Sequence, residues 1–115
     1  MSENKKIQLF KSLTPTEAFK LIKEHVNDPN WIILDIRTPW EFAENHIENA
    51  KNLDFTDPNL YEMVEKLDID RTYIIYCKSG RRSIKMLDIM KDLGFTNVYS
   101  IIGGFKGWKS TKFDI

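Results

Sequence analysis

Two short apolar runs, residues 31–34 and 73–76, constrain the fold of this chain more than any other feature. Each run consists only of large aliphatic or aromatic residues, so a strand formed from it needs both of its faces buried. Strands of this kind are typical of parallel sheets, which helices cover on both sides. Helical patterns separate the runs, and we therefore predict an α/β fold with a mostly parallel five-stranded sheet flanked by helices.

The expected strands and helices alternate along the chain. Strands are predicted at residues 7–10, 31–34, 50–53, 73–76 and 98–102. Helices are predicted at residues 15–26, 39–44, 60–67 and 82–93, followed by a short helical tail that contains Trp108. Thr14 and Glu17 form a capping pattern before the first helix, and Asp57 is expected to cap the third. Gly94 is suited to end the fourth helix in a left-handed conformation.

Length and composition indicate one globular domain spanning residues 1–115, with 42% hydrophobic and 30% charged residues. Because 17 basic residues balance 17 acidic ones, no overall field favours nucleic acid or a membrane surface, and neither is expected as a partner. No apolar run has membrane-helix length, and the first residues do not resemble an export signal. A lone cysteine excludes an internal disulfide and a multi-thiolate metal site. We expect a cytoplasmic protein without a metal or other cofactor.

The segment directly after residues 73–76 carries the candidate chemistry. It consists of Cys77, Lys78, Ser79, Gly80, Arg81, Arg82 and Ser83, here called the cysteine loop. A loop around a helix N-terminus directs several backbone N–H groups to one point, where the helix dipole and nearby cations also favour an anion. We expect the Cys77 sulfur at that point, with a lowered pKa and a nucleophilic thiolate. A structural cysteine is disfavoured, because cations at a helix N-terminus oppose its dipole.

The length of this loop separates two kinds of cysteine chemistry. Phosphatases that attack with cysteine place an arginine after five intervening residues, where this chain has Ser83. The cysteine loop is one residue shorter, so it should enclose something smaller than a tetrahedral phosphate. A single terminal sulfur atom on Cys77 suits that size. A cysteine phosphatase or arsenate reductase is therefore the less favoured alternative.

Three motifs in order resemble those of single-domain rhodaneses, over about residues 7–109. The cysteine loop resembles the family's Cys-x-x-Gly-x-Arg active-site loop in length and placement. The upstream motif is Asp35, Ile36 and Arg37, then Glu41 and Phe42, then His46, Ile47 and Ala50. The C-terminal motif is Gly94 and Phe95, then Asn97, Val98 and Tyr99, then Gly103, Gly104 and Trp108. This resemblance implies a rhodanese-like fold and sulfurtransferase activity.

The resemblance also implies a ping-pong reaction with no cofactor. The Cys77 thiolate would take the outer sulfur of a donor such as thiosulfate, and an acceptor (cyanide, a thiol or a partner protein) would remove it from the Cys77 persulfide. Lys78, Arg81 and Arg82 are candidates for attracting the anionic donor, and the family pattern favours Arg82 as a structural arginine. Lys78 occupies the position where many thiosulfate-using members have arginine. This departure favours an alternative, a sulfur-relay or regulatory module fed by a protein donor.

Several residues outside the loop are expected in supporting roles. Asp35 should support the loop or pair with an arginine. Arg37 should pair with a carboxylate such as Glu41, with donor binding as its alternative. His46 is expected to be a hydrogen-bonded structural histidine rather than a general base. Trp40 is expected either at the mouth of the site or in packing.

Overall fold

The computed structural model describes residues 7–113. The strands are β1 (Leu9–Leu13), β2 (Trp31–Asp35), β3 (Lys51–Asn52), β4 (Thr72–Tyr76) and β5 (Asn97–Ile101). The helices are α1 (Pro15–Glu24), α2 (Pro39–Glu44), α3 (Leu60–Glu65), α4 (Arg81–Asp92) and α5 (Gly104–Ser110). Within residues 7–113, none of these helices has the length and apolar character needed to cross a membrane.

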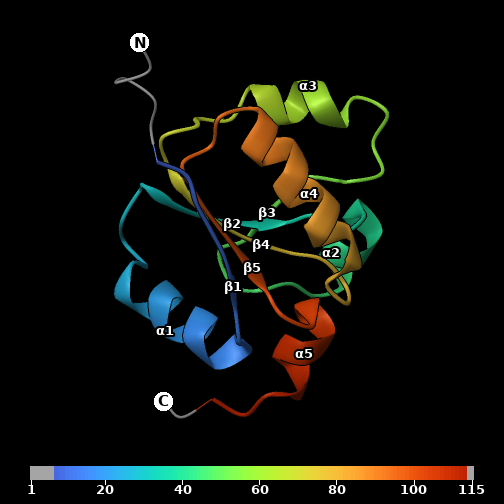
Figure 1. Ribbon diagram of the computed structural model, residues 1–115. Coiled ribbons are helices and arrows are strands. Elements are labelled where there is room, and N and C mark those ends of the chain that lie inside the picture. Colours follow the sequence, from blue (N-terminus) through green and yellow to red (C-terminus); the bar gives the residue numbers. More distant parts are fainter. Residues whose placement is uncertain (1–6, 114–115) are drawn as a thin grey trace.

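All five strands form one parallel sheet in the order β1-β5-β4-β2-β3, which confirms the predicted fold class. Helices α3 and α4 cover one face of the sheet, and α1 and α5 cover the other (Figure 1). The strand β4 is central, with β5 on one side and β2 on the other. Residues that follow β4 therefore emerge from the middle of the sheet.

The alternating side chains of β4 explain its central position. Tyr73 and Ile75 pack into the core beneath α3 and α4, whereas Ile74 and Tyr76 pack into the core beneath α1 and α5. All four side chains are at most 1% exposed. Each contributes roughly 1.5–3 kcal/mol through removal of apolar surface from water. Burial on both faces therefore holds the end of β4 in place, and with it the start of the cysteine loop.

The cap predicted at the start of α1 is present, and the cap predicted at the start of α3 is not. At α1, the backbone N–H of Thr14 donates to Glu17 Oε1 at 2.9 Å and the backbone N–H of Glu17 donates to Thr14 Oγ1 at 3.2 Å, which confirms the capping pattern. The predicted cap of α3 is wrong. Asp57 instead accepts from the backbone N–H of Asn59 at 2.8 Å in the preceding turn, and α3 begins without a side-chain cap.

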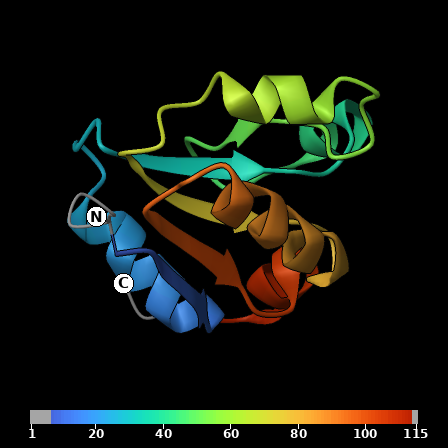
Figure 2. The same ribbon diagram turned by 45° about the horizontal axis from the view of Figure 1, so that its top comes forward.

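The chain leaves the two neighbouring strands β4 and β5 in opposite directions. After β4 it runs to α4 on one face, and after β5 it runs to α5 on the other face (Figure 2). Parallel α/β sheets bind their ligands at such a divergence, outside the carboxyl ends of the strands. The cysteine loop lies there, where it joins β4 to α4 and includes the first turn of that helix.

Candidate active site

Cys77 follows β4 directly, and its sulfur faces the start of α4. The side chain is 1% exposed, and Sγ accepts a hydrogen bond from the backbone N–H of Gly80 at 3.0 Å. Gly80 has a φ of +99°, a left-handed conformation that glycine adopts without a steric penalty. This conformation turns the chain into α4, which begins at the next residue. The loop therefore curls around the sulfur, which is buried beneath it.

The groups around Cys77 favour its thiolate. Burial raises the pKa of the thiol. The hydroxyl and backbone amide of Ser83 and the backbone amides of Gly80 and Arg82 lower this pKa by a larger amount. The net pKa of Cys77 lies below the ordinary value of 9.0. The Ser83 hydroxyl is itself buried and makes no hydrogen bond to any described residue, so it is free to donate to a charged sulfur. The loop therefore supplies donors to a negatively charged sulfur.

We expect a small alkylating reagent such as iodoacetamide to reach half its maximal rate with Cys77 below pH 9.0. The reason is that the thiolate, not the thiol, reacts. In Ser83→Ala the midpoint should move to higher pH, because one group that favours the thiolate is lost. Ser110→Ala, on the exposed surface of α5, should leave the midpoint unchanged. Intact-mass measurement of the alkylated fraction across pH checks this, and a wild-type midpoint no lower than that of Ser83→Ala would contradict it.

The start of α5 clamps the cysteine loop from the other side. The backbone N–H of Phe105 donates to the Cys77 carbonyl at 2.7 Å, and that of Lys106 donates to the Lys78 carbonyl at 3.0 Å. Gly104 makes this approach possible. A Cβ atom there would lie 2.8 Å from the Lys78 carbonyl carbon and closer still to the Cys77 carbonyl oxygen. The first backbone amides of α5 thus hold the loop carbonyls in place, while the loop itself continues into the first turn of α4.

The three cations of the loop differ in their surroundings. Lys78 and Arg81 are exposed. Arg82 is half-buried, and its Nη1 lies 3.6 Å from Glu41 Oε1. That nitrogen makes no hydrogen bond to any described residue, so the attraction to Glu41 is purely ionic. Arg82 therefore links α4 to α2, whereas Lys78 and Arg81 remain available to solvent and to ligands.

Arg37 pairs with Asp35, which confirms that Arg37 pairs with a carboxylate and Asp35 with an arginine, although the carboxylate is not Glu41. Arg37 Nη2 lies 2.7 Å from Asp35 Oδ2, and Nε donates to both carboxylate oxygens, at 3.0 and 3.1 Å. The same Nη2 donates to the Asn45 carbonyl at 2.6 Å, and the guanidinium lies 4.3 Å from the centre of the Phe105 ring. The pair is almost fully buried, because the chain turns back on itself directly after β2. Glu41 Oε1 instead accepts from the backbone N–H of Thr38 at 3.1 Å.

The structure also places the other two residues singled out by the sequence. Nδ1 of His46 lies 2.7 Å from the Phe42 carbonyl oxygen, and its ring stacks on the Phe42 ring at 3.7 Å. These contacts fit a structural histidine. Trp40, on α2, is 79% exposed, so it does not pack into the core.

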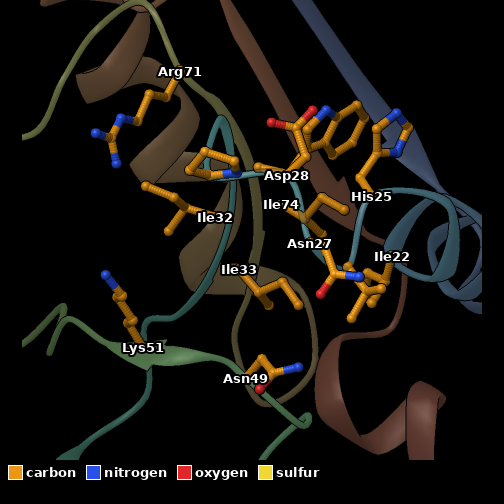
Figure 3. A pocket seen from close by; sticks show the side chains of 13 residues that line it. Ile22, His25, Asn27, Asp28, Ile32, Ile33, Asn49, Lys51, Arg71 and Ile74 are labelled. Atoms are coloured by element: carbon orange, nitrogen blue, oxygen red, sulfur yellow. The ribbon is translucent and has the colours of Figure 1, made fainter.

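One hollow among the described residues lies away from the cysteine loop. It has a volume of about 410 Å³ and lies beside β2 and α1, with Ile33, Ile74 and Lys51 among its lining residues (Figure 3). Ile33 and Ile74 project toward the core beneath α1 and α5, whereas Cys77 packs with the core beneath α3 and α4. Within residues 7–113 no three His, Cys, Asp or Glu side chains gather to hold a metal ion.

Two contributors to the site were not anticipated from the sequence. The backbone amides of Phe105 and Lys106 clamp the loop, and no sequence signal reveals a backbone donor. Glu41 caps α2 and faces Arg82, and here a signal was present. The segment Thr38-Pro39-Trp40-Glu41 repeats the Thr-Pro-x-Glu pattern that begins α1.

Comparison with known proteins agrees with this geometry. The rhodanese-like domain family matches residues 18–111. Proteins named thiosulfate sulfurtransferase GlpE from Coxiella burnetii and Pseudomonas entomophila are each 33% identical over 102 residues, covering 89% of this chain and 90% and 87% of theirs. The crystal structure of a rhodanese-related protein from Thermoplasma volcanium aligns with a TM-score of 0.75 at 25% identity, covering 90% of this chain and 95% of that one. These matches support sulfurtransferase activity at the level of the family. The chain belongs to the rhodanese-like domain family.

Proposed function

We propose that this chain transfers sulfane sulfur from a donor such as thiosulfate to a thiophilic acceptor, with Cys77 carrying the sulfur as a persulfide. The observation that carries this proposal is the arrangement around Cys77. A buried thiol with a lowered pKa accepts from the Gly80 amide, at the carboxyl end of the central strand. The relatives named thiosulfate sulfurtransferase GlpE support thiosulfate as the donor. A single thiol that must stay reduced also favours a reducing compartment such as the cytoplasm.

The first half-reaction loads Cys77. Its thiolate attacks the outer sulfur of thiosulfate and forms a new sulfur–sulfur bond. The bond between the two sulfur atoms of thiosulfate breaks, and sulfite leaves with that electron pair. The persulfide that remains carries a negative charge on its terminal sulfur. The amide of Gly80, the hydroxyl of Ser83 and the start of α4 are suited to stabilise this charge, as the donors of an oxyanion hole do.

The second half-reaction empties the site. An acceptor such as cyanide or a thiolate attacks the terminal sulfur, and the Cys77 thiolate leaves with the electron pair of the broken bond. Lowering the pKa of Cys77 therefore assists both steps, because it favours the attacking thiolate and also makes it a better leaving group. The exposed Lys78 and Arg81 are suited to attract the anionic donor.

Loop size argues against phosphate transfer at the same cysteine. The backbone amides of α5 hold the carbonyls of Cys77 and Lys78, so the loop cannot widen without breaking these hydrogen bonds. Arg82, the loop's last arginine, faces Glu41 on α2. A cysteine phosphatase needs its loop arginine and loop amides around a phosphate. We therefore rank phosphatase activity below sulfur transfer.

Mass spectrometry tests the proposal directly. After treatment with thiosulfate and removal of the excess, we expect intact protein to gain the mass of one sulfur atom, and peptide mapping to place it on Cys77. Subsequent addition of cyanide should remove this mass and produce thiocyanate. Cys77→Ser should show neither change. A wild-type protein that gains no sulfur, or one that gains it elsewhere, would contradict the proposal.

A further inference from the structure

Charge is distributed unevenly along this neutral chain. Residues 77–113, which include the cysteine loop, α4 and α5, carry eight lysines and arginines but only two acidic residues. Residues 7–76 carry seven basic and thirteen acidic residues. The two acidic residues of the basic part, Asp88 and Asp92, lie in the second half of α4, away from the loop. The segment that forms the cysteine loop, α4 and α5 is therefore the basic part of the chain.

The exposed cations extend beyond the loop. Lys78 and Arg81 belong to it. Lys85 lies four residues after Arg81 and so shares its face of α4. Lys106 lies at the start of α5, where its backbone amide donates to the Lys78 carbonyl. All four side chains are exposed. The carboxylate of Glu41 on α2 is engaged by Arg82.

Three large apolar side chains are exposed on the segments that meet at this end of the sheet. Trp40 precedes Glu41, the partner of Arg82, and is 79% exposed. Ile84, in the first turn of α4, is 65% exposed, and Ile102 is 54% exposed. The residue after Ile102 is Gly103, whose nitrogen lies 3.6 Å from where a Cβ of Gly80 would stand. The start of α2, the start of α4 and the turn before α5 gather at this end of the sheet (Figures 1 and 2).

We propose that this loop rim, made up of Trp40, Ile84, Ile102, Lys85 and Lys106, is a docking surface for an acidic protein whose cysteine takes the sulfur from Cys77. The inference rests on the proposed function. Thiosulfate is small and needs only the loop, so the surface beyond the loop is assigned to the other substrate, the acceptor. Exposed apolar side chains surrounded by cations are complementary to an acidic surface with an apolar centre. Two aliphatic side chains and a single indole favour protein over nucleic acid, which is bound through stacked aromatics.

The transfer step is balanced without a further reagent. The thiolate of the partner's cysteine attacks the terminal sulfur of the Cys77 persulfide and forms a sulfur–sulfur bond. The bond between Cys77 Sγ and that sulfur breaks, and Cys77 leaves as a thiolate. Because Cys77 is almost fully buried, the partner must bring its own sulfur to the mouth of the loop, which a docked surface achieves by orientation.

Two synthetic peptides that share one cysteine and the same apolar residues, but carry glutamates or lysines around them, test the proposal. Cys77 is loaded with thiosulfate, and loss of the persulfide to each peptide is followed by intact mass. At low ionic strength we expect the acidic peptide to react at least about tenfold faster than the basic one. This preference should nearly vanish at about 1 M salt, where charges more than about 3 Å apart are screened.

Variants locate the preference on the rim. Lys85→Glu combined with Lys106→Glu should remove it, and Trp40→Ala should slow transfer to the acidic peptide. Lys20→Glu combined with Lys66→Glu makes the same charge change at exposed positions on α1 and beyond α3, and should leave the preference intact. All variants should react alike with 2-mercaptoethanol at about 1 M salt, because this thiol is too small to need the rim and its thiolate is then screened from the rim charges. Equal rates for the two peptides, or an effect of the control pair as large as that of the rim pair, would overturn the proposal.

Binding separates failure of the docking surface from failure of the proposed function. The labelled peptides are titrated into Cys77→Ser, where no sulfur chemistry occurs, and binding is followed by fluorescence anisotropy. Preferential binding of the acidic peptide supports the docking surface even if wild type forms no persulfide. Persulfide formation without any peptide preference overturns the docking surface alone. Displacement of the acidic peptide by an oligonucleotide of equal charge, at equal concentration, would overturn the assignment to a protein.

Discussion

Cys77→Ser is expected to lower the rate of thiocyanate formation from thiosulfate and cyanide by at least about 10³-fold. Serine is not ionised near neutral pH, and its oxygen cannot form a persulfide. The hydroxyl can still accept from the Gly80 amide, so the loop should keep its shape. The rate of thiocyanate formation measures the loss. A variant as active as wild type would show that another group carries the sulfur.

The stability of Cys77→Ser provides the control for that experiment. Substituting oxygen for sulfur leaves the side chain close to its original size, so we expect a urea unfolding transition near that of wild type. If the variant is folded and inactive, the loss is chemical. If it unfolds, Cys77→Ala replaces it, because alanine introduces no buried hydroxyl that needs a partner.

Asp35→Asn is expected to lower the free energy of unfolding by about 3–5 kcal/mol. Asparagine keeps the shape of the side chain but removes the negative charge that faces Arg37 Nη2 at 2.7 Å. The guanidinium is then buried among neutral groups alone, namely the new amide oxygen, the Asn45 carbonyl and the faces of aromatic rings. Urea unfolding followed by circular dichroism measures the change.

Asp68→Asn provides the matched control for Asp35→Asn. Asp68 lies 3.5 Å from Arg71 Nε, but both side chains of that pair are about half exposed. An exposed pair contributes at most about 1 kcal/mol, because water and salt screen the attraction. Comparable destabilisation by the two substitutions would show that the Asp35–Arg37 pair does not hold the end of β2.

The sequence was most informative where local pattern and burial coincide. The apolar runs predicted β2 and β4, because a strand apolar on both faces has few alternatives in a chain of this length. The capping residues before α1 were predicted because their hydrogen bonds join residues three positions apart. The sequence order of the cysteine loop likewise predicted that Cys77 would lie between β4 and α4.

Contacts that depend on tertiary packing could not be predicted from the local sequence pattern. Arg37 has Asp35 and Glu41 at similar separations along the chain, and only the backbone turn after β2 decides between them. The strand β3 has only two residues instead of the predicted four, because it pairs with β2 at Leu34 and Asp35 alone. The close approach of α5 to the cysteine loop depends on where β5 ends relative to β4, which sequence spacing does not reveal.

The clamp between α5 and the cysteine loop restricts how this site can diverge. One inserted residue would bring the loop to the length that surrounds a phosphate, but it would also displace the carbonyls that Phe105 and Lys106 hold. A side chain at position 104 could not replace the lost contacts, because a Cβ atom there would collide with the backbone of Cys77 and Lys78. A new chemistry at Cys77 would therefore require simultaneous change in two segments distant in the chain. A single insertion in the loop would break the clamp without creating a working phosphate site.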